Sequence, residues 1–376
     1  MIRLLTFTKF KKELKSTSDE KRRKALIRNY IKQRLSSKGF PIVEGKNVTF
    51  IYIGKVRDKI SVIGDMNNWK PEVDLMKRIN GTNVYYKRMR FPLDARIEYA
   101  YMKDGKLILD LLNKKISLGG LGPYSELQMP NYKPSKEIDY NPKIHHGKIE
   151  AFRFNSKILN NNRLIHVYLP HNYDPSKSYP TIYAQDGGDY LRFGFFDTVL
   201  DNLIEKTLIK EVIAVFIDPV NRLFEYDLND KYVNFLVEEL VPYIDANYST
   251  KQNPSDRLVM GASFGGLISV YAAFRHPEVF GNVASQSGFL SRKKGQVMRE
   301  IEKSSKKNIK FYLDCGTFES NVGGVLGNFT KANRKMCEIL KRKGYNFIYQ
   351  EVHEGHNWGN WRSRLGDILM TFFKAS

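Results

Sequence analysis

Hydrophobic and polar positions follow three different patterns along the chain. In residues 17–39, apolar side chains recur at the spacing of one helix face, with basic residues between them: Leu26, Tyr30, Ile31 and Leu35. Thr17-x-x-Glu20 has the form of a capping box, and Gly39 and Pro41 follow the periodic run. The pattern predicts a helix over this segment.

Residues 45–116 change to the period of β-strands. Four runs are rich in β-branched and aromatic residues and are bounded by turn-forming residues: 47–53, 59–63, 83–89 and 97–102. These runs predict a small all-β sandwich. Residues 117–149 contain repeated Gly and Pro, which predict a linker.

From residue 150 onward, short apolar strands alternate with amphipathic helical runs. The expected strands are 166–169, 180–184, 212–217, 258–260, 282–285, 309–313 and 345–349. Such alternation is typical of a mainly parallel sheet with helices on both faces. The predicted fold class is α/β, preceded by a small all-β sandwich and an N-terminal helix. The predicted domains are 1–44, 45–116, 117–149 (linker) and 150–376.

Composition narrows the function classes. The 376 residues include 61 Lys and Arg against 40 Asp and Glu, and residues 1–40 hold thirteen of these bases against three acids. No RNA-binding signature, zinc finger or phosphate loop accompanies this basic segment, so a solvated helix face explains it better than nucleic-acid binding. We can assign it no role.

Membrane, metal and redox signals are absent from the sequence. No apolar run reaches about 18 residues, and the apolar start of the chain is short and broken by Thr and Lys, so we expect neither a membrane partner nor a secretory signal. Cys315 and Cys337 are too few for a disulfide framework or a four-ligand zinc site. We therefore expect reduced thiols, a cytoplasmic location, and no metal or organic cofactor. Nothing indicates an oligomeric state.

The sharpest chemical signal is the run Gly261-Ala262-Ser263-Phe264-Gly265. It matches G-x-S-x-G, follows an apolar strand and precedes a helix-like run, which is the setting of a nucleophile elbow. Ser263 is the candidate nucleophile, and the competing interpretation is a tight turn with an inert serine.

A serine hydroxyl needs a base to become a nucleophile. Where the serine sits on such an elbow, the order along the chain is serine, then acid, then histidine. His276, His353 and His356 follow Ser263. His276 is more typical of a helix end, and His353 extends a strand. His356 follows Gly355 in the loop after a late strand, so we favour His356.

The acid is expected on the loop after the strand at 309–313. Asp314 still lies in the strand pattern, whereas Glu319 lies beyond Gly316, so Glu319 is favoured and Asp314 stays an alternative.

Two backbone amides are needed to stabilise an oxyanion. One is expected from Phe264, and the other from the glycine loop after the strand at 180–184, at Gly188 or Gly187.

Taken together, residues 150–376 resemble α/β-hydrolase esterases related to enterochelin esterase and esterase D. The matching runs include Val167-Tyr168-Leu169-Pro170, Gln185-Asp186-Gly187-Gly188, Asn221-Arg222-x-x-Glu225-Tyr226, Glu239-Leu240-Val241-Pro242, Gly261-Ala262-Ser263-Phe264-Gly265-Gly266, Ser285-Gln286-Ser287-Gly288, Gly316-Thr317-x-Glu319, Gly355-His356 and Trp358-x-x-Trp361-Arg362. The resemblance implies Ser263 as nucleophile and His356 as base, and it places Glu319 where the family often has its acid. Trp358 is a candidate substrate contact.

Residues 45–115 resemble, more weakly, an immunoglobulin-like module of the glycogen-binding type. Gly64-Asp65-Met66-Asn67-Asn68-Trp69 and Tyr99-x-Tyr101-x-x-Asp104-Gly105 carry this match. The resemblance implies a carbohydrate partner or a module that shapes the site; for Trp69 and Tyr101 the alternative is packing.

The sequence therefore predicts a serine carboxylic-ester hydrolase acting on a small-molecule ester. A siderophore ester, an acyl-sugar ester and a feruloyl-type ester are all compatible substrates. Arg222 is a candidate contact for an anionic substrate, and its alternative is an ion pair with Glu225. A competing function is a glycan-binding protein with an inactive hydrolase domain.

Overall fold

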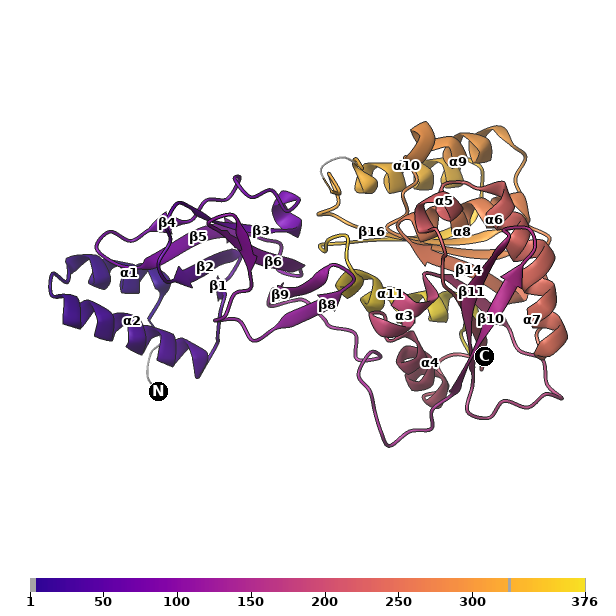
Figure 1. Ribbon diagram of the computed structural model, residues 1–376, viewed down its shortest axis with the longest axis horizontal. Helices are drawn as coiled ribbons and strands as arrows, with labels where there is room; N and C mark the ends of the chain where they lie inside the picture. Colours follow the sequence, from indigo (N-terminus) through magenta and orange to yellow (C-terminus); the bar gives the residue numbers. More distant parts are fainter. Residues whose placement is uncertain (1–4, 324–325, 376) are drawn as a thin grey trace. The chain divides into compact units, whose positions relative to one another are not determined.

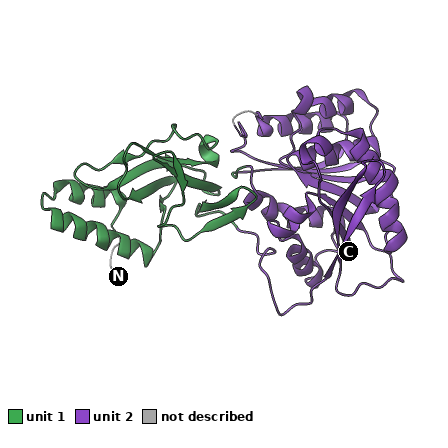
Figure 2. Cartoon of the chain, viewed as in Figure 1, with its two compact units in different colours: residues 1–133, 353–355 green, residues 134–352, 356–376 purple. Residues whose placement is uncertain are grey.

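The computed structural model describes residues 5–323 and 326–375 (Figure 1). The chain divides into two units, residues 1–133 with 353–355 and residues 134–352 with 356–376 (Figure 2). The first four residues of the expected basic segment lie outside the described residues.

The strands described in the first unit form two antiparallel sheets. One has the order β1-β2-β5-β4; the other has the order β3-β6-β9-β8, with β7 paired to β6. The bounds are β1 Ile42–Glu44, β2 Asn47–Ile53, β3 Ile60–Gly64, β4 Lys77–Arg78, β5 Val84–Arg90, β6 Arg96–Lys103, β7 Lys106–Ile108, β8 Ile116–Gly119 and β9 Gly122–Gln128. The two sheets face each other, since the rings of Phe50 on β2 and Tyr99 on β6 lie 4.8 Å apart. The four strands expected from the sequence are confirmed.

Two helices, α1 (Phe7–Ser16) and α2 (Glu20–Leu35), pack on the first of these sheets. Their apolar side chains share one cluster with the strands, and the rings of Phe10 and Tyr30 stack 3.9 Å apart. The basic segment is therefore an amphipathic cover, and apart from the buried Arg34 its charged side chains are exposed or partly exposed among the described residues.

The predicted helix start at Thr17 is wrong. Asp19 caps α2 by accepting a hydrogen bond from the backbone N–H of Arg22. The hydroxyl of Thr17 instead donates to the backbone oxygen of Glu13 at the end of α1. Asp is a strong N-cap residue, and α1, which was not predicted, already uses the Thr17 side chain.

The predicted linker over 117–149 is also too long. Residues 122–128 form β9, which pairs with β6 and with β8, and Pro123 lies opposite Leu118. Pro and Gly suggested a linker, but Gly122 and Pro123 lie at the end of β9 that pairs with β8 alone, since pairing with β6 involves only Ser125 to Gln128. A strand end without a neighbour on one side tolerates a missing ladder donor. The segment between the two strands is therefore shorter than predicted: β9 ends at Gln128 and β10 starts at Lys148.

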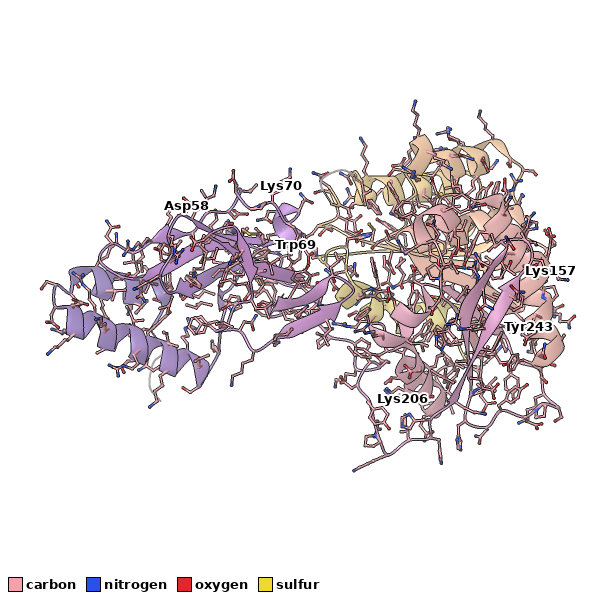
Figure 3. All side chains as sticks on the ribbon, viewed as in Figure 1. Asp58, Trp69, Lys70, Lys157, Lys206 and Tyr243 are labelled. Carbon is pink, nitrogen blue, oxygen red and sulfur yellow. The ribbon has the colours of Figure 1, made fainter. Side chains whose placement is uncertain are left out.

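The aromatic residues that suggested a glycan site take part in packing. Trp69, labelled in Figure 3, lies 4.3 Å from the ring of Tyr124 and donates its Nε1 hydrogen to Asp65. Tyr101 is 1% exposed and donates to the backbone oxygen of Ile51. Tyr101 therefore offers no ring face to a ligand.

The second unit contains, in its described part, an eight-stranded sheet of order β10-β11-β13-β12-β14-β15-β16-β17. The strands from β13 to β17 along this order pair in parallel, and β10 and β11 add two antiparallel pairings at one edge. The bounds are β10 Lys148–Ser156, β11 Asn161–Leu169, β12 Thr181–Gln185, β13 Ile213–Ile217, β14 Arg257–Ala262, β15 Asn282–Gln286, β16 Lys310–Gly316 and β17 Asn346–Val352. The expected mainly parallel sheet is confirmed.

Helices cover both faces of this sheet because successive strand residues point to opposite sides. Val259 belongs to the core cluster shared with α5 to α10, whereas Leu258 and Met260 belong to the cluster shared with α3, α4 and α11. The bounds are α3 Gly187–Arg192, α4 Phe196–Glu205, α5 Arg222–Tyr226, α6 Asp230–Asn234, α7 Val241–Asn247, α8 Phe264–Arg275, α9 Arg292–Lys303, α10 Phe329–Arg342 and α11 Trp358–Phe373. A π-helical turn, Phe235–Leu240, joins α6 to α7, and Tyr243 on α7, labelled in Figure 3, packs on Phe152 and Phe154 of β10.

The described residues show neither a membrane-spanning helix nor a cluster of metal ligands. None of the helices there combines the length and the apolar character needed to cross a membrane. The same part of the chain holds no group of three or more His, Cys, Asp or Glu side chains arranged to hold a metal ion.

Candidate active site

Ser263 sits on the sharp turn between β14 and α8. Its φ of 58° and ψ of −116° are rare for a residue with a side chain. A Cβ on Gly261 would lie 2.5 Å from the carbonyl carbon of Gly265, and one on Gly266 would lie 2.6 Å from Oγ of Ser285. The glycines around the serine are therefore required by close packing of strand, turn and helix.

His356 connects this serine to an acid. Its Nε2 lies 3.0 Å from Oγ of Ser263, although 93 residues separate the two. Its Nδ1 lies 2.7 Å from Oε2 of Glu319. The ring is held between those of Phe329 and Trp361, whose centroids lie 4.8 and 5.0 Å from it.

The contacts of Glu319 determine which nitrogen of His356 carries the proton. Glu319 is fully buried, and its Oε1 accepts hydrogen bonds from the amide of Gly316 and the hydroxyl of Ser287. A carboxylate only accepts, so Nδ1 of His356 donates to Oε2. The unprotonated Nε2 then faces the hydroxyl of Ser263, which is the orientation of a general base toward a nucleophile.

The other acid and histidines lie elsewhere. Asp314 lies inside β16, where it accepts from Gln286, and burial raises its pKa to about 8. His276 contacts Glu278, and His353, which belongs to the first unit, contacts Asp94.

The two glycines after β12 begin helix α3. A Cβ on Gly187 would lie 2.3 Å from the backbone carbon of Phe216 on β13, so close packing accounts for this glycine. The amide of Gly188 donates to Oδ1 of Asp218 at 2.6 Å. Because β12 and β14 are adjacent and parallel, α3 and α8 begin at the same edge of the sheet.

The alternative prediction for Arg222, an ion pair with Glu225, is wrong. Arg222 makes two hydrogen bonds to Asp186, at 2.7 and 2.8 Å. Glu225 is instead bound by Arg163, whose guanidinium lies 2.9 and 3.0 Å from the two carboxylate oxygens. Both carboxylates are buried, and Glu225 pairs with an arginine of β11 rather than with Arg222 on its own helix, α5.

Trp358 is 7% exposed and belongs to the core cluster on the α11 side. Its ring packs edge-on against Tyr190 and Trp361. Packing thus accounts for its position, and its contact with substrate stays a prediction.

Sequence reasoning gave no role to three residues near the site. Ser287 and Trp361 occur in runs that carried the family resemblance, and Asp218 follows strand β13. Their contacts join segments distant in the chain, such as Gly188 with Asp218, so no local pattern marks them.

Comparison with known proteins bears on this site. A family model described as "Putative esterase" matches residues 156–372. Among curated proteins, the chain is 31% identical over 234 residues to the uncharacterized protein YjcH of Bacillus subtilis, covering 59% of this chain and 96% of YjcH. It is 29% identical over 261 residues to an endo-1,4-beta-xylanase/feruloyl esterase of Xylanibacter ruminicola, covering 64% of this chain and 34% of that protein.

Solved structures show the same fold. A ferric enterobactin esterase from Salmonella typhimurium superposes with a TM-score of 0.76 at 21% identity, covering 89% of this chain and 95% of that one. A ferulic acid esterase from Anaeromyces mucronatus superposes with a TM-score of 0.55 at 23% identity, covering 65% and 97%. The expected α/β-hydrolase fold is confirmed, while the likeness of residues 45–115 to a glycogen-binding module is not.

Proposed function

Since the chain belongs to the putative esterase family and is an ester hydrolase, we propose that it cleaves carboxylic esters with Ser263 as nucleophile. His356 is the general base and Glu319 the acid that orients it. One observation carries this proposal: a single imidazole bridges the serine hydroxyl and a buried carboxylate, at 3.0 and 2.7 Å.

The reaction follows from the direction of these hydrogen bonds. His356 Nε2 takes the proton of Ser263 as Oγ attacks the ester carbonyl, and the carboxylate of Glu319 stabilises the imidazolium that forms. His356 then returns the proton to the departing alcohol. In the second half, the same nitrogen activates a water that releases the acid and restores Ser263.

The oxyanion is stabilised by backbone amides. Phe264 is the first residue of α8, so its amide points out of the helix N-terminus, where developing negative charge is favoured. We assign the second donor to the start of α3, at Gly188 or Gly187.

An ester with an aromatic acid group is the substrate class we favour. Leu223 and Phe224 are 64% and 62% exposed on α5, directly after Arg222, which itself lies 3.4 Å from the backbone oxygen of Ala262 beside the nucleophile. Exposed apolar side chains at such a place suit an aromatic ring. Relatives named as feruloyl and enterobactin esterases are consistent with this class.

Replacement of the nucleophile tests the proposed function. Ser263→Ala should lower kcat/KM for p-nitrophenyl acetate by several orders of magnitude and abolish labelling by a fluorophosphonate. Ser269→Ala is the matched control, because this buried serine of α8 bonds only to the backbone oxygen of Gly265 among the contacts described. Full activity in Ser263→Ala would overturn the proposal, and unlabelled but folded wild-type protein would favour the glycan-binding alternative.

Substrate class is tested separately with methyl ferulate, ferric enterobactin and an acetylated xylose. Turnover of the acetyl sugar alone would contradict the aromatic assignment and favour an acyl-sugar esterase.

A further inference from the structure

The buried acid Glu319 is held by more than its histidine. Its Oε1 accepts from the hydroxyl of Ser287 at 2.6 Å and from the backbone amide of Gly316 at 2.7 Å. The other oxygen, Oε2, contacts His356. Each carboxylate oxygen therefore has its own donors, and the rotation of the carboxylate is set by the pair on Oε1.

The direction of the hydrogen bond from Ser287 is determined by a second contact. Nε1 of Trp361 lies 3.0 Å from Oγ of Ser287, and an indole nitrogen can only donate. The hydroxyl oxygen of Ser287 thus accepts from Trp361, and its single proton is directed to Glu319. A continuous chain runs from Trp361 through Ser287, Glu319 and His356 to Ser263.

Resting on the proposed function, we propose that Ser287 and Trp361 are positioning residues for the reaction of Ser263. They hold the carboxylate of Glu319 aimed at Nδ1 of His356, and so keep Nε2 free to accept the serine proton. Ser287 acts through Glu319, whereas Trp361 acts through Ser287 and through the ring of His356.

The backbone of Ser287 supports a specific need for its hydroxyl. The residue follows β15 with a φ of 46°, in the left-handed region where Gly or Asn is favoured, and it is fully buried. Its amide donates to the backbone oxygen of Asp314 at 2.9 Å. A strained serine at a buried turn is best explained by what its side chain does, because glycine would adopt the same turn at lower cost.

Trp361 supports the site in a second way. Its ring meets that of His356 edge-on at 5.0 Å and 87°. Its own backbone oxygen accepts from the side-chain amide of Gln286 at 2.9 Å, which fixes this turn of α11 against β15. One residue of α11 therefore orients both the base and, through Ser287, the acid.

Removal of the hydroxyl is the first test. Ser287→Ala and Ser287→Gly should each lower kcat for p-nitrophenyl acetate by about tenfold to hundredfold, with KM changed less than about threefold. The glycine variant suits the positive φ and guards against a folding defect. Ser285→Ala is the matched control: this serine is also buried, two residues earlier, and its hydroxyl has no hydrogen-bond partner within the described residues.

A double-mutant cycle separates positioning from general packing. In a Glu319→Gln background, Ser287→Ala should change kcat by less than about threefold, because the group it acts on is already altered. Trp361→Phe should lower kcat less than Ser287→Ala does. Its effect on kcat should also become smaller in the Glu319→Gln background. Multiplicative losses in the double variant, or wild-type kcat in Ser287→Ala, would overturn the inference.

Failure of the two proposals can be told apart. If Ser263→Ala is inactive but Ser287→Ala and Ser287→Gly are fully active, the proposed function stands and only the positioning role is lost. If Ser263→Ala retains activity, the proposed function itself fails.

Discussion

The carboxylate of Asp218 accepts a hydrogen bond from the backbone amide of Gly188, with 2.6 Å between Oδ1 and the nitrogen. An amide that already donates to a carboxylate oxygen is less available to donate to the oxyanion that develops on a substrate. If Gly188 supplies the second oxyanion donor, Asp218 competes with the transition state for it.

Removing this competitor gives the first prediction. Asp218→Ala should raise the rate constant for fluorophosphonate labelling of Ser263 by about twofold to tenfold. Without Asp218, the amide of Gly188 does not have to break a hydrogen bond to a carboxylate before it donates to the oxygen of the reagent. Stopped-flow labelling measures this rate. An unchanged or lower rate would assign the second donor to another amide, with Gly187 as the next candidate.

Arg222 and Asp186 form an ion pair in which the carboxylate is buried and the arginine side chain is 37% exposed, and removing the arginine should be costly. Arg222→Leu leaves the Asp186 carboxylate, whose side chain is 6% exposed, without its counter-charge, so we expect a loss of about 3 kcal/mol in unfolding free energy. Urea unfolding measures this loss. Arg292→Leu is the matched control: Arg292 is about as exposed as Arg222 (41% against 37%) and also makes two hydrogen bonds to its partner. That partner, Asp227, is 21% exposed and stays partly hydrated, so the loss should stay below about 1 kcal/mol. Equal losses would contradict the role of burial.

Gly355 precedes His356 and belongs to the first unit, where a Cβ would lie 2.1 Å from Cγ of Asp65. Gly355→Ala therefore forces a shift of the backbone next to the base. We expect kcat/KM to fall by about tenfold to hundredfold, since small displacements of a catalytic group are expensive. Gly366→Ala in α11 is the control, because its Cβ would meet nothing closer than Cγ of Glu137 at 3.9 Å. Full activity in Gly355→Ala would show that the turn tolerates a side chain.

Asp314 should make stability depend on pH. Burial raises its pKa from 3.8 to about 8, so between these values the folded protein binds a proton that the unfolded chain has released. The stabilisation is complete below pH 4 and is lost as pH rises toward 8, with a slope of about 1.4 kcal/mol per pH unit from this group. Asp314→Asn should flatten the fall of Tm between pH 5 and pH 8.

The pH experiment has an internal comparison. Asp65, in the first unit, also has a pKa raised to about 8 by burial, so part of the slope should survive in Asp314→Asn. Glu338→Gln, at an exposed carboxyl of α10, should leave the wild-type slope intact. Parallel curves for Asp314→Asn and the wild type would contradict the prediction.

The local sequence pattern was sufficient to predict an element wherever its residues are set by contacts close by in the chain or by burial in the sheet. Short apolar runs identified the strands from β12 to β16, because these strands are buried on both faces of the sheet. The elbow at Ser263 was recognisable because Gly261 is demanded by the backbone of Gly265, four positions further along the same turn. Pro and Gly misled at β9, because Gly122 and Pro123 lie at the end of this strand that pairs with β8 alone, where a missing ladder donor is tolerated.

Chain order and spacing selected Ser263, Glu319 and His356 as candidates, since strand ends of a parallel sheet gather at one edge. Their distances, the pairing of Arg222 with Asp186, the occupied amide of Gly188 and the support of Glu319 by Ser287 came only with the packed molecule. Hydrogen bonds between segments 30 or more residues apart, such as Gly188 with Asp218 and Ser287 with Glu319, leave no periodic trace in a sequence. They depend on which side chains the closed core brings within about 3 Å of one another.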